Sequence, residues 1–472
     1  MTVPATPTRF VLNRGLVVAD VPGGTPTVDY LRRHAHLSGT KVGCREGDCG
    51  ACLVLLGELA EEDLRYHPVT SCLLPVAALE GRHLVTVEGL NGDGLNLVQQ
   101  AIVDEGAVQC GFCTPGIVVA LTGFLLSSPE LVAGDAIAAV EGNICRCTGY
   151  VSIRRVVDRL VEALATRLDP HEERLPALIR EGFLPAYFGR IRDQLQAVHS
   201  TPAAPVRSQP QVVVAGGTDL YVQRPLAMAE AELFLLARAG LSGIWDDQEH
   251  LYVGATTTVE ELRCSAQVRQ QIPGLERFTR LVSSQPIRHL ATVGGNLVNA
   301  SPIGDLTIML LALDAEVGLG LDDVTRVVPL RAFFLGYKEL DLQPPELVRW
   351  VRFRRHEAGH RFNFEKVSKR AHLDIASVNS AVSLVEEGGI LTNVNLAAGG
   401  VAPVPLYLAA ASRYLVGREP SAANVRQAAT VAATEIAPIS DVRGSAEYKR
   451  LLLRQLIYAH FDVLFGLGEQ VS

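Results

Sequence analysis

Eight of the nine cysteines lie between Cys44 and Tyr150, in two groups with different spacings. Cysteines that cluster in a chain kept under reducing conditions are typical of metal binding or redox chemistry rather than of a disulfide framework. The sequence therefore predicts two metal sites in series. The first group is Cys44, Cys49, Cys52 and Cys72, and the second is Cys110, Cys113, Cys145 and Cys147.

The first group has the spacing CxxxxCxxC followed by a distant fourth cysteine, which is the plant-type ferredoxin pattern for a 2Fe-2S cluster. Gly43, Gly47 and Gly50 surround these thiols and allow the loop to fold closely around a compact inorganic core. Their backbone amides can also point at the sulfurs and tune the reduction potential. The alternative is a structural zinc site, but such sites usually pair two short CxxC-like knuckles. The spacing favours iron and sulfur.

The second group combines a CxxC with a CxC. Thr114 is a suitable N-cap and Pro115 suits the first helical position, so this CxxC is expected just before a helix whose dipole favours thiolates. The CxC precedes a second expected helix, with an apolar stripe at helical spacing. We expect both pairs to converge on one cluster, with zinc or two unrelated thiol pairs as the alternative. The stripe consists of Ile153, Val156, Val157, Leu160, Val161 and Leu164.

Strands and helices must position these thiols. The sequence predicts strands at residues 9–13, 15–20, 53–56 and 83–89 and a helix at 27–36, which together form a small β-rich domain. From Leu95 the apolar period changes to that of a helix, with a stripe at Leu95, Val98, Ile102 and Val103. The apolar run 117–126 is too short to cross a bilayer and is expected to form a buried helix.

Two glycine-containing segments follow in the second half of the chain. QVVVAGGTDL is a β-branched run that ends at Gly216 and Gly217, and such a turn exposes amide donors that can hold a pyrophosphate. Its simpler interpretation is an ordinary strand and a tight turn. ATVGGNLVNASPIGDL offers a second amide-rich turn and polar side chains for a ribose or phosphate, so both segments are expected to clamp a dinucleotide. The residues of the second segment are Gly294, Gly295, Asn296, Ser301 and Asp305.

EGDCGACLV, QCGFCTPGI and NICRCTGY, in this order, resemble the paired 2Fe-2S domains of the xanthine dehydrogenase and molybdenum hydroxylase family. The resemblance implies that the first cysteine group ligates an outer cluster beside a flavin and the second an inner cluster beside a molybdopterin. It also implies that Gln109 and Cys147 lie close to the pterin of a molybdenum domain.

The glycine segments, together with FFLGYK at residues 333–338, resemble the flavin domain of the same family, whose fold is related to vanillyl-alcohol oxidase. The eukaryotic enzymes of the family have an aromatic residue some twenty positions before the aspartate, where this chain has Val282, so the resemblance does not extend to adenine stacking at this position. Lys369, Arg370 and Asp374 are similar to a region near the flavin that helps to admit NAD, although a solvated charged loop explains them equally well. The implied FAD contacts are Val213, Val214, Ala215, Gly216, Gly217, Thr218, Asp219, Leu220 and Asp305, with Val348 and Lys366 as weaker matches.

The fold expected from the pattern and the resemblance is a multidomain α+β chain. Its parts are a plant-type ferredoxin (β-grasp) domain at 1–91, a helical-bundle 2Fe-2S domain at 92–168, a linker and the start of the flavin domain at 169–211, a vanillyl-alcohol-oxidase-like FAD domain at 212–358 and a C-terminal α+β flavoprotein domain at 359–472. The apolar pieces LPALI and FLPAYF indicate that part of the linker packs on a surface.

The composition and the N-terminal sequence argue against several other classes of protein. The formal charge of −8 and the absence of a concentrated excess of Lys and Arg argue against a nucleic-acid partner. The N-terminal residues lack a secretory pattern, so the expectation is a cytoplasmic protein without membrane association. His289 is interpreted as a structural histidine and Cys264 as a small buried hydrophobic residue. Apart from the redox centres, we expect no catalytic residue on this chain.

The family resemblance also implies a function. Two 2Fe-2S clusters and one FAD would carry electrons from a large molybdopterin-binding subunit, expected on a separate chain as in the two-chain xanthine dehydrogenases of bacteria. That subunit would hydroxylate hypoxanthine and xanthine to urate, NAD would accept the electrons, and two heterodimers would assemble. The alternatives are an aldehyde or N-heterocycle hydroxylase and a non-catalytic metal-binding or redox-sensing protein.

Overall fold

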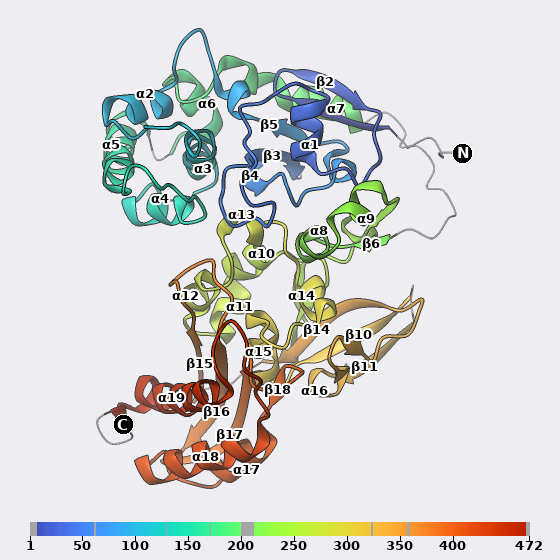
Figure 1. Cartoon of the computed structure of the whole chain (residues 1–472), viewed down its shortest axis with the longest axis vertical. Helices are drawn as coiled ribbons and strands as arrows, with labels where there is room; N and C mark the ends of the chain where they lie inside the picture. Colours follow the sequence, from blue (N-terminus) through green and yellow to red (C-terminus); the bar gives the residue numbers. More distant parts are fainter. Residues whose placement is uncertain are drawn as a thin grey trace. The chain divides into compact units, whose positions relative to one another are not determined.

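The structure is a computed structural model that describes residues 7–60, 63–128, 130–169, 171–199, 212–321, 324–355 and 359–468 (Figure 1). It divides into two compact units. The first comprises Met1–Leu235 and Ser284–Leu290, and the second Leu236–Ser283 and Ala291–Ser472. Residues 200–211, which belong to the expected linker, lie outside the described residues.

A five-stranded sheet with the order β2-β1-β5-β3-β4 organises the start of the first unit. β3 is apolar without alternation because both of its faces are buried. Leu53 and Leu55 pack in a core with the helices that follow, whereas Val54 and Leu56 pack with α1 (Thr27–Arg33). The strand expected at residues 83–89 is shorter than predicted, because it ends at Val85 and a 3₁₀ helix (Val87–Leu90) replaces its second half. The strands are β1 (Thr8–Leu12), β2 (Gly15–Ala19), β3 (Leu53–Ala60), β4 (Asp63–Thr70) and β5 (His83–Val85).

Four helices form the next part of this unit. α3 is buried along most of its length, which confirms the expected buried helix. The stripe expected on α2 is only half correct, because Val98 and Ile102 are buried but Leu95 and Val103 are exposed. Asn96 caps α2 through a capping box, so Leu95 precedes the helix. The helices are α2 (Leu97–Asp104), α3 (Thr114–Ser127), α4 (Ala133–Val140) and α5 (Val151–Arg167).

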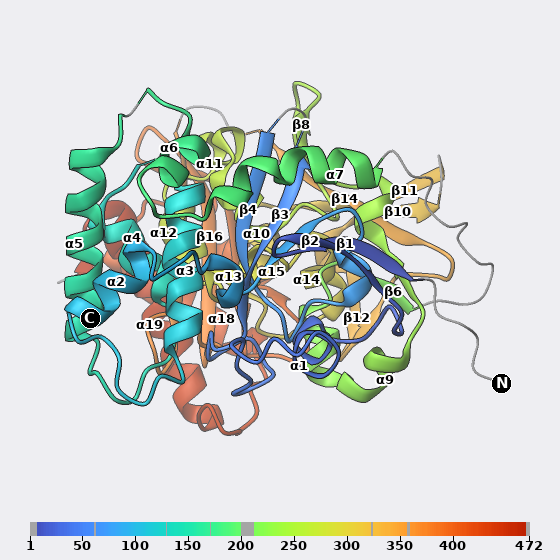
Figure 2. The ribbon, with the colours of Figure 1, turned by 90° about the horizontal axis from the view of Figure 1, so that it is seen from above.

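The described start of the expected linker packs on the sheet, as its apolar pieces predict. Tyr187 and Phe188 are buried, and the Phe188 ring lies 5.4 Å from that of Tyr66, whose hydroxyl lies 2.7 Å from His83 Nδ1. α7 lies against β1 (Figure 2). This segment contains α6 (Arg174–Arg180), the 3₁₀ helix η3 (Ala186–Arg190) and α7 (Ile191–His199).

Two further pieces belong to the first unit although they come later in the sequence. A small β–α–α–β segment packs into the core around α1, where the Tyr221 hydroxyl donates to the Gly24 carbonyl at 2.7 Å. The short helix α13 (Gln285–Arg288) lies against β4, and the His289 ring stacks on His67 at 4.6 Å. The segment contains β6 (Val212–Val214), α8 (Thr218–Gln223), α9 (Pro225–Glu230) and β7 (Leu233–Leu235).

The second unit contains an antiparallel sheet with the order β11-β10-β14-β9-β8. Its buried face packs on short helices in one continuous core with α15 (Asp305–Ala312). The strands are β8 (Ile244–Asp246), β9 (His250–Gly254), β10 (Glu316–Leu321), β11 (Val324–Pro329) and β14 (Leu347–Arg354); the helices are α10 (Val259–Cys264), α11 (Ala266–Gln271), α12 (Leu275–Arg280), α14 (Val293–Asn299) and α16 (Leu330–Phe333), with a small hairpin of β12 (Phe334–Gly336) and β13 (Glu339–Leu340).

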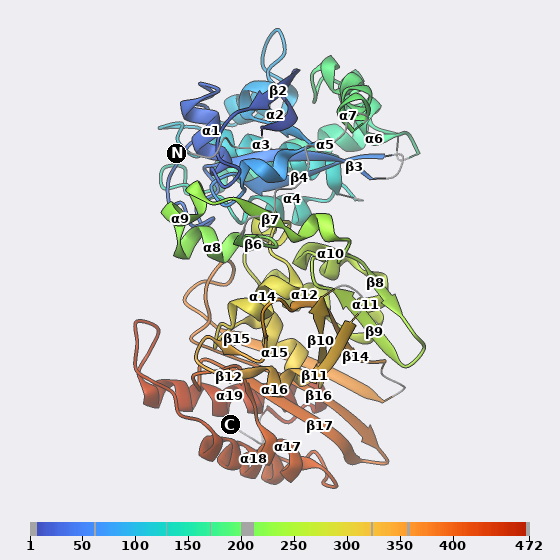
Figure 3. The ribbon, with the colours of Figure 1, turned by 90° about the vertical axis from the view of Figure 1, so that its right-hand side faces the viewer.

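A second antiparallel sheet in this unit has the order β15-β16-β17-β18 (Figure 3). Side-chain alternation in β16 assigns its two faces. Val378 and Val382 pack with α17–α19, whereas Ala381 packs in the core that contains α15. Asn379 therefore points to the α15 side. The elements are β15 (His360–Val367), β16 (Val378–Glu387), β17 (Ile390–Gly399), β18 (Leu406–Tyr407), α17 (Ala409–Leu415), α18 (Ala422–Glu435) and α19 (Ala446–Phe465).

A buried histidine makes the stability of this unit depend on pH. His460 of α19 is fully buried, its Nδ1 lies 3.0 Å from Asn363 Nδ2, and burial lowers its pKa to about 3. Because the unfolded chain takes up this proton below about pH 6.5 and the folded chain does not, stability falls with pH between these two values. We predict a loss of about 2 kcal/mol from this residue between pH 7 and pH 5.

The measurement is urea unfolding at pH 7 and pH 5. A His460→Asn variant, which keeps an acceptor near Asn363, should lose this part of the pH dependence, and the same replacement at the exposed His171 is the control. An equal pH dependence in the His460→Asn variant would contradict the assignment.

Candidate functional site

The first cysteine group lies in the loop between α1 and β3, with its fourth member in the turn after β4. Cys52 and Cys72 are buried, and their sulfurs are 3.3 Å apart. Of the three glycines predicted to direct amides at the sulfurs, Gly47 does so, with a backbone hydrogen bond to Cys72. The backbone amide of Glu46, which was not predicted, donates to Cys44 Sγ at 3.3 Å. The Cys49 thiol donates to Cys44 and lowers the pKa of Cys44 to about 5, against the opposing effect of burial. These contacts define two thiol pairs, Cys44–Cys49 and Cys52–Cys72.

The second group lies at the N-terminus of α3 and just before α5. Thr114 is the first residue of α3, and Cys113 takes the N-cap position expected for Thr114. Thr114 Oγ1 has no hydrogen-bond partner and does not cap the helix. Pro115 consequently lies at the second helical position instead of the predicted first, still within the first turn. The sulfurs of Cys110 and Cys147 are 3.6 Å apart and both residues are exposed.

The second pair of this group is more enclosed. Cys113 and Cys145 are buried. Burial is the larger cause of the raised pKa of Cys113, and hydrogen bonding to Cys145 raises this pKa further. Burial also raises the pKa of Cys145, but hydrogen bonds from Thr148 and nearby amides outweigh it and lower this pKa to about 7. Thr148 Oγ1 lies 3.1 Å from Cys145 Sγ. The structure therefore brings each predicted cysteine group together as two pairs.

This pairwise arrangement fits the chemistry of a 2Fe-2S cluster, in which four thiolates serve two irons. A structural zinc ion instead places four ligands tetrahedrally around one point. Within the described ranges, no group of three or more His, Cys, Asp or Glu side chains could hold one metal ion. Gln109, like Cys147, is exposed.

The first glycine segment has the expected strand and glycine turn, and a short helix that was not predicted follows them. β6 ends at Val214, Gly217 adopts a left-handed conformation with φ +74°, and α8 begins at Thr218. The segment Val213–Leu220 belongs to the first compact unit, whereas the other predicted flavin contacts belong to the second. The two sets are therefore described separately.

The second glycine segment differs from the expected open turn. Gly294, Gly295 and Asn296 form the first turn of α14, and Thr292 caps this helix through its side-chain oxygen. Their amides already donate within the chain, to Ala255 O, Thr292 Oγ1 and Thr292 O. The Asn296 side chain accepts from Thr307 Oγ1 at 2.8 Å. These three amides are therefore not free to clamp a dinucleotide, because Ala255 accepts from Gly294 and Thr292 accepts from Gly295 and Asn296.

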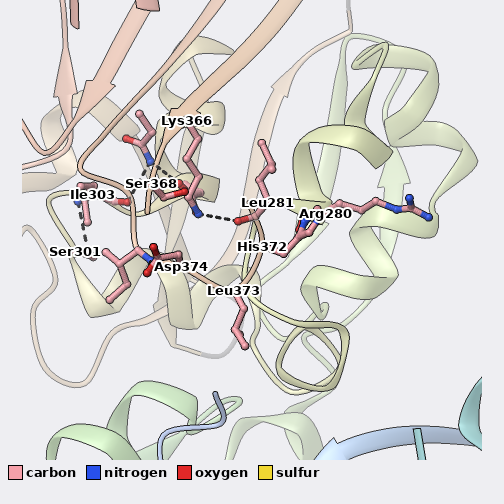
Figure 4. A network of polar contacts seen from close by, with 12 residues as sticks. Arg280, Leu281, Ser301, Ile303, Lys366, Ser368, His372, Leu373 and Asp374 are labelled. Atoms are coloured by element: carbon pink, nitrogen blue, oxygen red, sulfur yellow. Dashed lines mark hydrogen bonds and ion pairs between the residues drawn. The ribbon is translucent and has the colours of Figure 1, made fainter. Parts of the chain in front are cut away.

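Asp305 and Lys366, predicted as separate flavin contacts, form an ion pair in the second unit. Lys366 Nζ donates to Asp305 Oδ2 at 2.7 Å and to the Leu281 carbonyl at 2.7 Å, and Figure 4 shows its side chain directed at Leu281. Asn379 donates to Asp305 Oδ1 at 2.5 Å and to the Ile303 carbonyl. Burial raises the pKa of Asp305, and the charge of Lys366 opposes this rise.

The Asp305 network includes one residue that the sequence interpretation missed. Asn379 is fully buried in β16, where it is the one amide side chain of the strand sequence VNSAVSLVEE, and this was the available signal. Ser301 is close by, and its hydroxyl accepts from the Ile303 amide at 3.4 Å. The network therefore fixes the loop that precedes α15.

The remaining sequence predictions have mixed outcomes. Val348 and Val282 are buried, and Val348 lies in the core. Arg370 donates through its amide to Asp374 and through its guanidinium to the Leu373 carbonyl, as in a self-bonded charged loop. The interpretation of Cys264 as a buried residue is wrong, because it is exposed at the C-terminal end of α10, where its side chain leaves the core.

Four family models match the chain in sequence order. They are described as a 2Fe-2S iron-sulfur cluster binding domain (residues 10–77), a 2Fe-2S binding domain (86–158), an FAD binding domain in molybdopterin dehydrogenase (192–353) and a CO dehydrogenase flavoprotein C-terminal domain (364–463). The four matches do not overlap, and they indicate two 2Fe-2S domains followed by an FAD-binding domain and a flavoprotein C-terminal domain. The multidomain α+β organisation is thereby confirmed.

Individual relatives agree with this domain content. Xanthine dehydrogenase of Emericella nidulans is 27% identical over 87% of this chain and 35% of its own length, and aldehyde oxidase 1 of Cavia porcellus is 26% identical over 97% and 39%. The chain thus spans little more than a third of these relatives. A solved structure of carbon monoxide dehydrogenase from Hydrogenophaga pseudoflava is 28% identical with a TM-score of 0.51, over 54% of this chain and 89% of that one.

No helix in the described parts of the chain is both long and apolar enough to span a membrane.

The buried ion pair gives a stability prediction. The Lys366 side chain is 2% exposed and that of Asp305 12%. Lys366→Met leaves a buried carboxylate without its cation and should lower the free energy of unfolding by about 3–5 kcal/mol. Adding Asp305→Asn to this variant removes the unpaired charge and should restore part of the loss.

Urea unfolding of the single and double variants measures both effects. Arg355→Met removes the exposed pair of Arg355 with Asp246 and is the control, with an expected loss of about 0–1 kcal/mol. A loss in Lys366→Met no larger than in this control would show that the pair is not needed.

Proposed function

We propose that this chain transfers electrons from a molybdopterin-binding partner through two 2Fe-2S clusters to FAD and then to NAD, as part of a xanthine dehydrogenase. The partner would hydroxylate hypoxanthine and xanthine to urate. The observation that carries the proposal is the contact of the cysteines in pairs, in two groups that match two different 2Fe-2S domain models ahead of a flavin-binding region.

The residues of the chain would each have a defined part. Cys44, Cys49, Cys52 and Cys72 would hold the outer cluster, and Cys110, Cys113, Cys145 and Cys147 the inner one. In the second unit, Ser301 and Asp305 would contact FAD, with Lys366 fixing the Asp305 carboxylate. In the first unit, Val213–Leu220 is the flavin segment that the sequence predicts. When bound, these groups supply one-electron transfer and its conversion to hydride transfer.

The exposed surface around the inner group supports a protein partner at that end. Cys110 and Cys147 are exposed, and so are the large apolar side chains of Phe112, Ile144 and Tyr150. Apolar side chains that gather next to exposed cysteines favour a surface that a partner covers. The outer group would correspondingly deliver electrons to FAD.

A second candidate is favoured by the similarity to carbon monoxide dehydrogenase and aldehyde oxidase. The chain would then serve a partner that oxidises another substrate, with the same clusters and FAD. The decisive experiment is to isolate the complex with its large subunit and to assay NADH formation with xanthine, an aldehyde or carbon monoxide. Turnover of one of the others without xanthine turnover would refute the purine assignment.

Metal and flavin analysis tests the cofactors. The chain purified without oxygen should contain about four iron atoms and one FAD. NADH should bleach the flavin and cluster absorbance, because both lie on the proposed electron path. Zinc in place of iron would support a non-catalytic metal-binding protein, and bands that NADH leaves unchanged would contradict the acceptor assignment.

Single cysteine variants test the order of the clusters. Cys147→Ser should disturb the inner cluster and Cys49→Ser the outer one, so each should remove a different cluster signal in electron paramagnetic resonance (EPR) spectra. Both should interrupt substrate-dependent reduction of NAD. Cys264→Ser is the control, since this thiol belongs to neither group. Unchanged electron transfer in either ligand variant would contradict a series arrangement.

A further inference from the structure

Arg45 directly follows Cys44 and has a left-handed backbone conformation, with φ +62°. Two other residues of the described loop, Gly47 and Gly50, have the same conformation, with φ +81° and +67°. Glycine adopts this conformation readily, whereas a residue with a Cβ does so only where its surroundings compensate for the strain. The contacts of the Arg45 side chain therefore need an explanation.

The Arg45 side chain is held by Asp29 of α1. Its Nη1 donates to Asp29 Oδ2 at 2.9 Å and its Nη2 to Asp29 Oδ1 at 2.8 Å. A bidentate pair of this kind fixes the plane and the direction of the guanidinium. The Asp29 side chain is 15% exposed, and the more exposed Arg33 approaches it only to 3.8 Å. Arg45 is thus the closer of these two cations to the carboxylate.

Asp29 is itself fixed to the turn that carries Cys72. It lies in the first turn of α1, directly after Val28, whose amide donates to the Ser71 carbonyl at 3.1 Å. Ser71 and Cys72 are neighbours in the turn after β4. The ion pair between Arg45 and Asp29 therefore connects the loop of one thiol pair with the turn that supplies a cysteine to the other.

The Arg45 guanidinium lies close enough to the buried cysteines for charge on their sulfurs to act on it. The hydrogen bonds to Asp29 are the largest cause of the raised pKa of Arg45. Charges on Cys72 and Cys52 raise this pKa further, against the effect of burial. Because an interaction between two charges acts in both directions, the guanidinium also stabilises negative charge at these sulfurs.

We propose that the Arg45–Asp29 pair sets the reduction potential of the outer cluster, with Asp29 as the positioning residue that keeps the guanidinium beside the cysteines. The inference rests on the proposed function, since it requires a 2Fe-2S cluster on the first cysteine group. Reduction adds one electron to that cluster, and no covalent bond forms or breaks. The Arg45 cation stabilises the added negative charge and the Asp29 carboxylate destabilises it, so the two charges move the potential in opposite directions.

Two single variants separate the two charges. Arg45→Gly removes the cation and suits the left-handed backbone, and Asp29→Asn removes the anion with little change of shape. EPR-monitored redox titration of the chain, purified without oxygen, measures the potential of each cluster. The outer signal is the one that Cys49→Ser removes, and iron analysis reports assembly.

The proposal predicts opposite shifts in these variants. Arg45→Gly should disfavour reduction of the outer cluster about tenfold, which is about 59 mV toward lower potential for a one-electron couple. Asp29→Asn should favour reduction by a similar factor. The double variant should shift less than either single variant, because both charges are then absent. The inner cluster should keep its potential in all three and serves as the internal reference.

The matched control is the ion pair of Arg82 with Glu58, which are 3.2 Å apart and also partly exposed. Glu58 lies on β3, about 17 Å along the strand from Leu53, where the strand leaves the cysteine loop. Arg82→Gln and Glu58→Gln should therefore leave the potentials of both clusters unchanged.

Any result other than opposite shifts in the two assembled single variants would overturn the proposal. If either variant lacks the outer cluster, Arg45→Lys decides, since it keeps the charge without the bidentate bonds. An unchanged outer potential in Arg45→Lys supports the role of the charge, whereas a changed potential or a missing cluster refutes it. Absence of the outer cluster from the unsubstituted chain would be a failure of the proposed function itself.

Discussion

Close approach of thiol groups that lie far apart in the sequence is the constraint on which the first unit depends. Cys52 and Cys72 come into contact because β3 and β4, the two strands between them, form one antiparallel pair. Cys110 and Cys147 meet because the segments that precede α3 and α5 come together, as the hydrogen bond between Cys113 and Cys145 also shows. In both cases the packing of strands and helices stabilises the fold, and the loops position the cysteine sulfurs.

The sheet of the first unit connects the parts of the chain that carry the two cysteine groups. β3 has no exposed face, because one side packs with α1 and the other with α3. A strand shared by two cores fixes the loop before it relative to the helix beside it. That arrangement places Gly50 against Gly116 and allows direct backbone contact between the cysteine loops. The same sheet also receives the apolar segment around Phe188.

In the second unit, a buried charged group connects elements that are distant in the sequence. Asp305 lies at the start of α15, where the helix dipole favours an anion, and Lys366 reaches it from β15. Asn379 satisfies the other carboxylate oxygen from β16. Three elements thus hold one carboxylate whose own burial disfavours its charge. Such a group is stable only with all its partners present.

The sequence by itself determined the two cysteine groups, the buried helix α3 and the strand and glycine turn around Gly217, because spacing and local periodicity encode them. It did not determine that Ala255 and Thr292 accept the amides of the Gly294–Asn296 segment, nor that Cys264 is exposed. Only the tertiary structure decided these points, together with the Asp305–Lys366–Asn379 network and the Arg45–Asp29 ion pair. Their partners are distant in the chain, and a hydrogen bond between distant residues leaves no periodic signal in the sequence.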